Sequence, residues 1–188
     1  MLLKNKENTY AVVKGNIFEQ SLNRVNSKKL STNIGSSVII PHVCNNVNGF
    51  GAGFAGAVAD TYPAVKENFH LLGKNAVLGY VQFVVVKEDA STKNKLVIAN
   101  MIAQNGIVSY DNPRPLHYPS LVKCMERVKE YCFLLSKNTD NNPVEIHAPK
   151  FGSGLAGGNW YFISDLINDI WYDLNVYIYD KKPFLRKN

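Results

Sequence analysis

The sequence has few cysteines and no cysteine pair. Its three cysteines, Cys44, Cys124 and Cys132, are an odd number and form no C-x-x-C motif, which argues against a disulfide framework and against a zinc site of the usual spacing. We expect all three to pack in the core. No cluster of histidine, cysteine and carboxylate residues has metal-ligand spacing, so we predict neither a metal nor a cofactor.

The sequence also lacks a long hydrophobic run. No apolar stretch reaches the roughly 18–20 residues that a membrane span requires, and the first ten residues contain no signal-peptide segment. We therefore expect a cytoplasmic protein that makes no membrane contact. With 188 residues, 46% of them hydrophobic and only 19% charged, residues 1–188 are predicted to form one domain with an ordinary core, and we expect a monomer.

Acidic residues are outnumbered, and the formal net charge is +6. Basic clusters at Lys28-Lys29 and from Lys181 to Lys187 would attract a polyanion, either a nucleic acid or a small anionic ligand. Aromatic residues do not alternate with these basic residues as they do in a groove for single-stranded nucleic acid. We therefore favour the small ligand and keep nucleic acid as the less favoured partner.

Two common phosphate-binding motifs are missing. No Gly-Lys-Ser/Thr sequence is present after the Gly-rich segments, and their spacing does not fit G-x-G-x-x-G. What the chain does contain is two Gly-rich segments, PHVCNNVNGFGAGFAGAV at 41–58 and PKFGSGLAGGNW at 149–160, each between a strand-like and a helix-like run. Bare glycine backbone and a helix N-terminus both suit a phosphate group. We expect the two segments to meet beyond the carboxyl ends of the strands and to hold one diphosphate between them.

Strand-like and helix-like segments alternate along the chain, which predicts an α/β fold with helices on both faces of a sheet. Strands are predicted at 10–14, 38–44, 80–86, 96–103, 144–148 and 176–179, and helices at 53–72, 119–136 and 160–174. Pro63 is predicted to divide or kink the first helix, because proline removes a backbone donor. The connection 87–95 is predicted as a surface turn, 111–115 as an extended loop and 21–33 as a polar insertion.

The combination of motifs resembles the macro domains, which bind ADP-ribose. It consists of His42-Val43-Cys44-Asn45, Gly51-Ala52-Gly53-Phe54-Ala55, Gln104-Asn105-Gly106-Ile107 and the segment from Phe151 to Gly158, and the resemblance extends from Lys14-Gly15-Asn16-Ile17 through Trp160. Within that family the chain looks closest to the branch that includes ADP-ribose-1″-phosphate phosphatases. The resemblance implies a three-layer α/β/α fold with a central mixed, mostly parallel sheet.

The resemblance also implies which residues bind the ligand. Asn16 and Ile17 would hold the adenine, with Asn16 in the place of a common Asp, and Asn45 would orient the distal ribose. Phe151 would flank the ligand. The ribose and diphosphate would be approached by Gly51, Ala52, Gly53 and Phe54, and the phosphates would be wrapped by Gly152, Ser153, Gly154, Leu155 and Ala156.

Three candidate catalytic residues follow from the same resemblance: His42, Asn45 and Asn159. An imidazole of near-neutral pKa at His42 would transfer a proton to the leaving oxygen or orient water; the alternative is a hydrogen-bonded core histidine. Asn159 stands where the family often has an Asp and cannot act as a general base, and we favour its role as a helix N-cap. Lys150 either neutralises a terminal phosphate or is solvated, and His147 is predicted to be structural.

The leading prediction for function is a hydrolase that removes the phosphate from ADP-ribose-1″-phosphate. Two alternatives use the same fold. One is a module that binds ADP-ribose or another NAD-derived signal without turnover. The other is a hydrolase that removes ADP-ribose from a modified protein or nucleic acid.

Overall fold

The computed structural model describes residues 8–26, 36–138 and 142–180, and every structural statement below concerns these residues. The strands are β1 (Ala11–Val13), β2 (Ser37–Asn45), β3 (Val81–Glu88), β4 (Lys95–Gln104), β5 (Val144–Pro149) and β6 (Asn175–Tyr179). The α-helices are α1 (Ile17–Asn26), α2 (Gly53–Thr61), α3 (Pro63–Leu72), α4 (Tyr118–Asn138) and α5 (Trp160–Ile170), and a short 3-10 helix covers Gly73–Asn75.

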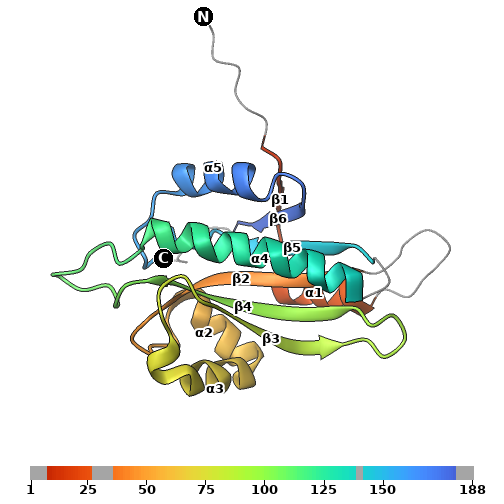
Figure 1. Ribbon diagram of the computed structural model, residues 1–188, viewed down its shortest axis with the longest axis horizontal. Helices are drawn as coiled ribbons and strands as arrows, with labels where there is room; N and C mark the ends of the chain where they lie inside the picture. The colour runs from red at the N-terminus through yellow and green to blue at the C-terminus, as the bar shows by residue number, and fades with distance from the viewer. Residues whose placement is uncertain (1–7, 27–35, 139–141, 181–188) are drawn as a thin grey trace, which may run out of the picture.

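The six strands form one sheet in the order β1-β6-β5-β2-β4-β3 (Figure 1). All neighbouring strands are parallel except β3 and β4, which are antiparallel. The sheet is therefore mixed and mostly parallel, as predicted. β2 lies in its middle and is buried along almost its whole length, as expected for a parallel strand that is covered on both faces.

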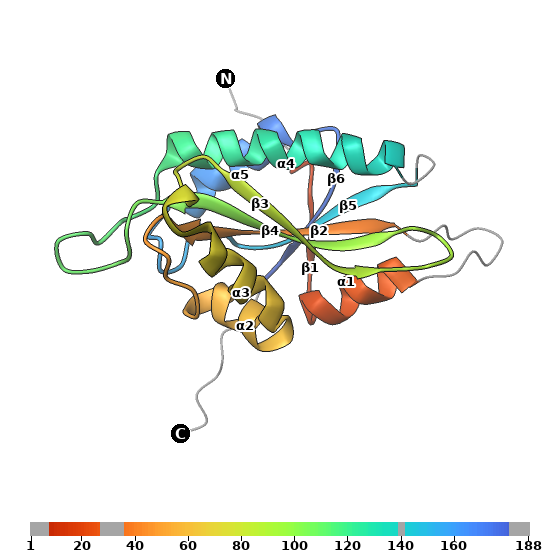
Figure 2. The same ribbon diagram turned by 60° about the horizontal axis from the view of Figure 1, so that its bottom comes forward.

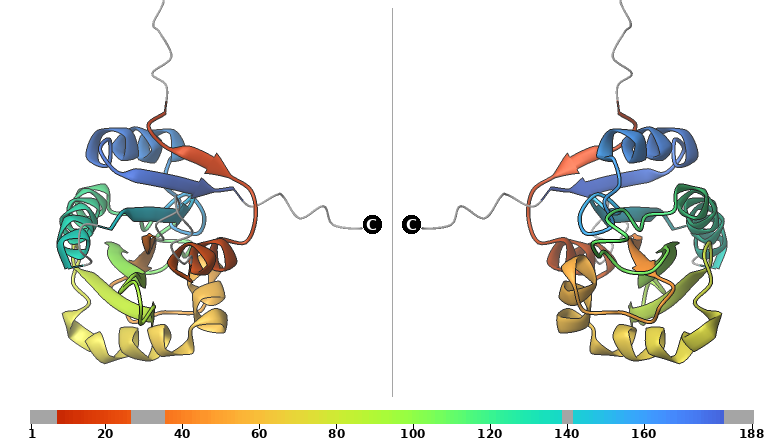
Figure 3. Two further views of the ribbon diagram at one scale, coloured as in Figure 1. Left: turned by 90° about the vertical axis from the view of Figure 1, so that its right-hand side faces the viewer. Right: turned by 90° about the vertical axis from the view of Figure 1, so that its left-hand side faces the viewer.

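Helices cover both faces of the sheet and complete three layers. α4 and α5 lie on one face, and α1, α2 and α3 lie on the other (Figures 1, 2 and 3). The core beneath α4 and α5 includes the fully buried Leu121 and Trp171, and the opposite core includes Val25, Val58 and Val65. The predicted α/β/α architecture is confirmed. None of the helices that the structure describes is long and apolar enough to span a membrane.

The predicted elements differ from the observed ones mainly at their ends. Pro63 occupies the first position of α3 and separates it from α2, as expected for a residue that cannot continue the preceding helix. α5 ends at Ile170 rather than at residue 174, and β3 extends to Glu88, so the predicted turn at 87–95 shortens to the residues between β3 and β4. Cys44, Cys124 and Cys132 are all free and buried, as predicted.

α1 is the main correction to the predicted elements. Residues 21–26 were predicted to belong to a polar insertion, but they form the second half of this helix. Its inner face combines the buried Ile17, Ser21 and Val25 with the partly buried Phe18 and Leu22, which have helical spacing that the prediction overlooked. The rest of the predicted insertion, including Lys28-Lys29, and the basic segment 181–187 lie outside the described residues.

Candidate functional site

The two Gly-rich segments border one cavity of about 480 Å³. It lies at the carboxyl ends of β2, β4 and β5, where Asn45, Gln104 and Pro149 end their strands. One wall consists of Gly49, Phe50, Gly51, Ala52, Gly53, Phe54 and Ala55. The opposite wall consists of Pro149, Lys150, Phe151, Gly152, Gly154, Leu155 and Ala156. A Cβ atom placed on Gly53 would lie 3.5 Å from Cδ1 of Leu155, so the two segments face each other closely, as the sequence predicts.

A second cavity of about 880 Å³ adjoins the first, and Phe54 and Pro149 border both. Asn16 and Ile17 line this second cavity, and their contact with the adenine stays a prediction. The other lining residues are Lys14, Gly15, Phe18, Ala57, Asp60, Thr61, Tyr179 and Asp180. Together the two cavities form a cleft that crosses the end of the sheet.

The Asn16 side chain already has a structural partner. Its Oδ1 atom accepts hydrogen bonds from the backbone N–H groups of Phe18 at 2.9 Å and Glu19 at 3.4 Å, which is the geometry of an N-cap for α1. The resemblance implied that Asn16 holds the adenine, and that contact stays a prediction. Because its oxygen caps the helix, the side chain offers its amide N–H groups to a ligand.

Asn45 shapes the turn that leads into the first Gly-rich segment. Its Oδ1 atom accepts from the backbone N–H groups of Val47 at 3.1 Å and Gly49 at 2.9 Å, and its Nδ2 atom donates to the Gly49 carbonyl at 2.7 Å. The β2–β4 pairing shifts register between Cys44 and Asn45, which re-aims the end of the strand toward this turn. The second N–H of Nδ2 remains for a ligand, and contact with the distal ribose stays a prediction.

Glycine is required at two positions of the Gly-rich segments for different reasons. Gly53 has a φ angle of +58°, a backbone conformation that other residues adopt only with strain. A Cβ atom on Gly158 would lie 2.3 Å from Cδ2 of Leu116 and 2.6 Å from the Gly152 carbonyl oxygen. The second Gly-rich segment is therefore packed tightly against the loop that precedes α4, a contact that the sequence analysis did not foresee.

His42 lies in the cavity floor and is only 1% exposed. A chain of hydrogen bonds determines which nitrogen of the imidazole ring carries the hydrogen. Gln82 Nε2 donates to the Asn68 carbonyl at 3.0 Å, so Gln82 Oε1 accepts from Asn100 Nδ2 at 3.0 Å. Asn100 Oδ1 then faces His42 Nε2 at 2.6 Å, and since an amide oxygen only accepts, Nε2 carries the hydrogen.

The same surroundings determine the charge of His42. Burial lowers the pKa of His42 from 6.5 to about 4, although the hydrogen bond to Asn100 opposes this shift. The Nδ1 atom lies 3.7 Å from Sγ of Cys44, whose own pKa is raised by burial, so that Cys44 stays a thiol. The near-neutral pKa on which the predicted proton transfer depended is not found, and the alternative of a hydrogen-bonded core histidine fits the geometry.

Three other predicted site residues have structural contacts. Phe151 borders the cavity, but it is 3% exposed and its ring packs against Trp171 with centroids 5.8 Å apart, so the predicted ligand-flanking ring belongs to the core. Ser153 Oγ donates to the Lys150 carbonyl at 2.9 Å. Asn159 Oδ1 accepts from the Tyr161 N–H at 2.9 Å, which confirms the predicted N-cap of α5. Neither Ser153 nor Asn159 is among the described residues that line the two cavities.

The charged groups of the cleft are few. Lys150 lines the 480 Å³ cavity, and its Nζ atom lies 2.7 Å from Asp180 Oδ2 in a partly exposed ion pair, so its contact with a phosphate stays a prediction. Among the described residues that line the 480 Å³ cavity, none is an Asp or a Glu. The cavity therefore offers backbone N–H groups and amides rather than an acid–base pair.

Two residues to which the sequence-based prediction gave no role also line the cavity, although the motif Gln104-Asn105-Gly106-Ile107 belonged to the resemblance. Ile107 and Val108 border the 480 Å³ cavity and are 56% and 43% exposed. They follow the Gln104-Asn105-Gly106 turn, which is held in place because Gly106 N–H donates to Asn46 Oδ1 at 2.8 Å. The position of this turn directly after a buried strand was the available signal.

Comparisons with known proteins agree with this geometry. No protein-family model matches the chain. An ADP-ribose 1″-phosphate phosphatase of Lodderomyces elongisporus is 26% identical over 155 residues, which cover 78% of this chain and 89% of that protein.

Solved structures resemble the whole fold. A protein of unknown function from Bacteroides thetaiotaomicron has a TM-score of 0.71 at 26% identity and covers 94% of this chain and 100% of its own. A macrodomain protein from Streptomyces coelicolor has a TM-score of 0.63 at 25% identity, and the match covers 92% of this chain and 99% of that protein. Thermosipho africanus DarTG, solved in complex with ADP-ribose, shares the fold at 14% identity with a TM-score of 0.62. The match covers 92% of this chain and 43% of that protein.

These likenesses, together with the six-stranded sheet and the paired glycine segments, define the chain as a macro domain by fold. Among named relatives it is similar in sequence to an ADP-ribose 1″-phosphate phosphatase.

Proposed function

We propose that this macro domain binds ADP-ribose and its derivatives in the cleft, with the diphosphate between the two Gly-rich segments. The observation that carries the proposal is that both segments line one cavity at the carboxyl ends of three parallel strands. The adenosine end would occupy the adjoining 880 Å³ cavity beside Asn16. This division follows from the continuity of the two cavities through Phe54 and Pro149.

The start of α2 supports an anionic ligand. Its N-cap residue, Ala52, makes no side-chain hydrogen bond to the helix, and the first turn contains no acidic residue. The first-turn N–H groups and the positive end of the helix dipole therefore face the cavity wall without an internal anionic or polar cap. α5, at the end of the other Gly-rich segment, is capped by Asn159 instead.

The relatives support the same ligand class. The curated relative is named for an ADP-ribose derivative, and the Thermosipho africanus DarTG structure contains ADP-ribose. Both are proteins other than this chain, and the inference to this chain depends on the shared fold and cleft.

Calorimetric titration with ADP-ribose tests the proposal, and Gly154 offers a clean variant. A Cβ atom at Gly154 would meet no heavy atom within 4 Å, whereas Gly53, with its positive φ, would be strained by any substitution. Gly154→Glu places a carboxylate in the cavity, and Gly154→Gln is the matched neutral control.

We expect Gly154→Glu to weaken ADP-ribose binding at least tenfold more than Gly154→Gln does, because like charges repel in a partly enclosed site. Equal affinities of the two variants, or no binding of ADP-ribose to the unmodified protein, would contradict the proposal.

As a second and finer function we propose removal of the phosphate from ADP-ribose 1″-phosphate. The named relative favours this reaction. Water attacks the phosphorus atom, the bond between phosphorus and the ribose oxygen breaks, and the products are ADP-ribose and inorganic phosphate. Backbone N–H groups of the Gly-rich segments would stabilise the charge that develops on the phosphoryl oxygens.

The residues of the cavity limit how this reaction is assisted. Asn45 and the backbone would position the substrate and a water molecule. His42 would stay neutral and would act through its place in the cavity floor rather than as a proton donor. We therefore expect a modest rate, since the cavity lining that the structure describes contains no carboxylate to serve as a general base.

Release of phosphate, followed by mass spectrometry of the nucleotide product, tests the reaction. A His42→Gln variant can still donate to Asn100, and we expect it to retain phosphate release, whereas Gly154→Glu should lose it. If the unmodified protein binds ADP-ribose but leaves ADP-ribose 1″-phosphate intact, the protein is a binding module. If His42→Gln binds ADP-ribose normally but releases no phosphate, the proposal that His42 does not transfer a proton is wrong.

A further inference from the structure

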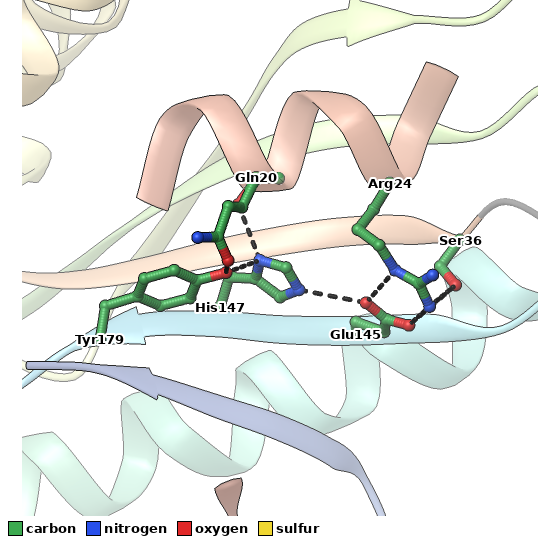
Figure 4. A network of polar contacts seen from close by, with 7 residues as sticks. Gln20, Arg24, Ser36, Glu145, His147 and Tyr179 are labelled. Carbon is green, nitrogen blue, oxygen red and sulfur yellow. Dashed lines mark hydrogen bonds and ion pairs between the residues drawn. The ribbon is translucent and has the colours of Figure 1, made fainter. Parts of the chain in front are cut away.

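A buried network of polar side chains lies between α1 and the sheet (Figure 4). At one end is Glu145 of β5, whose side chain is 4% exposed. Arg24 of α1 donates to both carboxylate oxygens, with Nε 2.9 Å from Oε2, and Ser36 Oγ donates to Oε1 at 3.1 Å. This network borders a third cavity of about 450 Å³, separate from the 480 Å³ cavity.

The network continues toward the nucleotide cleft. Glu145 Oε2 lies 3.1 Å from Nε2 of His147, and Nδ1 of His147 lies 3.0 Å from the Tyr179 hydroxyl and 2.9 Å from Ser21 Oγ. The Tyr179 hydroxyl donates to Gln20 Oε1 at 3.1 Å. Figure 4 follows this path from β5 across to α1.

The last hydrogen bond of the path reaches the cleft wall. Gln20 Nε2 donates to the Lys14 carbonyl at 3.0 Å, and residues 14–16 line the 880 Å³ cavity. Gly15 has a φ angle of +131°, and a Cβ atom there would lie 2.1 Å from Gln20 Nε2. The backbone of this segment therefore lies directly on the Gln20 side chain, and only glycine allows the approach.

The direction of the hydrogen bonds explains how the network holds the segment. Burial raises the pKa of Glu145, but hydrogen bonds from His147 and Arg24 outweigh it and lower the pKa to about 2. An ionised Glu145 only accepts, so it orients the Nε2–H of His147, and Nδ1 of the ring then accepts from Ser21 Oγ. The single hydroxyl hydrogen of Tyr179 is donated to Gln20, so Tyr179 contacts the His147 ring without donating to it. At the other end, the Lys14 carbonyl also only accepts, which orients the Gln20 amide and leaves its oxygen for Tyr179.

We propose that this network, from Glu145 to Gln20, positions residues 14–16 as a wall of the nucleotide cavity, with Gln20 and Tyr179 as positioning residues for the nucleoside end of the ligand. The inference rests on the proposed binding of ADP-ribose. Ordering a wall segment before the ligand arrives removes part of the entropic cost of binding. The network thus favours affinity although Gln20, Glu145 and His147 do not line the cleft.

The first experiment measures the segment without any ligand. Amide hydrogen exchange of Gly15 and Asn16 is compared in the unmodified protein, Gln20→Leu, Tyr179→Phe and Tyr177→Phe. Tyr177 is the matched control, because it borders the 450 Å³ cavity and its ring contacts His147, but its hydroxyl makes no hydrogen bond within the described ranges. We expect faster exchange in Gln20→Leu and Tyr179→Phe and unchanged exchange in Tyr177→Phe.

The second experiment measures affinity for ADP-ribose and for AMP, which contains the nucleoside end. We expect Gln20→Leu to weaken both about fivefold to tenfold, the loss that corresponds to one hydrogen bond. Tyr179 borders the cleft itself, so Gln20→Leu separates positioning from contact. The double variant Gln20→Leu/Tyr179→Phe should be little weaker than either single variant, because both interrupt one path.

The outcomes separate this inference from the proposed function. If the unmodified protein does not bind ADP-ribose, the proposed function is wrong, while the exchange experiment still decides whether the network holds the segment. If exchange at Gly15 and Asn16 is the same in all four proteins, or if Gln20→Leu binds AMP as the unmodified protein does, the positioning role is refuted.

Discussion

His42 gives the sharpest quantitative prediction, because it is buried without charge. A histidine in the unfolded chain has the ordinary pKa of 6.5, whereas in the folded protein it is about 4. Between these values the unfolded state binds more protons than the folded state, so the folded state loses stability as the pH falls from about 6.5 toward 4. The full shift corresponds to about 3 kcal/mol.

The window between pH 7.5 and pH 5 isolates this effect. Within it the predicted loss from His42 is about 2 kcal/mol, calculated from the two pKa values. The folded pKa of Glu145 is about 2, and its ordinary value of 4.5 lies below the window. Carboxylates of this kind therefore contribute little before the pH falls further.

Urea denaturation at several pH values measures the free energy of unfolding of the unmodified protein and of His42→Gln. The other histidines are common to both proteins, so only the difference between the two curves is interpreted. The unmodified protein should lose about 2 kcal/mol more than the variant between pH 7.5 and pH 5. Parallel curves would refute the buried, neutral His42, as would a ¹⁵N spectrum in which Nε2 of His42 lacks a hydrogen.

Three further predictions concern single positions. Gly158→Ala should destabilise the protein by about 1–3 kcal/mol in urea denaturation, because its Cβ would lie 2.3 Å from Leu116, whereas Gly154→Ala should stay within about 0.5 kcal/mol; equal stabilities would contradict the packing of this loop. Asn159→Ala should cost about 1 kcal/mol through loss of the N-cap while leaving ADP-ribose affinity unchanged, and a loss of binding at full stability would instead give Asn159 a part in the site. The folded pKa of Glu145 is about 2, below its ordinary pKa of 4.5, so the ionised carboxylate stabilises the fold fully above pH 4.5. About 3 kcal/mol of the free energy of unfolding should be lost as the pH falls toward 2. Glu145→Gln should abolish this part of the acid dependence, and an unchanged acid profile would count against it.

Features that depend on local chemistry could be predicted from the sequence. Pro63 divides two helices because a proline ring excludes the preceding turn, and Asn159 caps α5 because its side chain reaches an N–H group two residues away. The two Gly-rich segments follow parallel strands, and parallel strands bring their carboxyl ends to one edge of the sheet. Their meeting in one cavity was therefore predictable.

Features that depend on distant contacts could not be predicted in the same way. The neutral state of His42 depends on its burial, and the position of its ring hydrogen depends on the amide orientation of Asn100, which lies 58 residues away along the chain. The resemblance implied that Phe151 flanks the ligand, but its ring is buried and packs against Trp171 in the core. Within α1 the polar Ser21 is buried among apolar neighbours, and the partner that makes a buried serine acceptable there is His147 of β5.

The pairing of β1 with β6 has a consequence for the order of assembly. Ala11 lies beside Tyr177 in the sheet, and β6 is the strand with which β1 pairs. The first strand of the chain can therefore join the sheet only after the last strand has been synthesised. The neighbouring strands β2, β4 and β3 have no such delay, since all three lie within residues 37–104. During synthesis on a ribosome, the part of the sheet made of β2, β3 and β4 can therefore form first. The cleft wall at residues 14–16 follows directly after β1, so it is completed only when β1 pairs with β6.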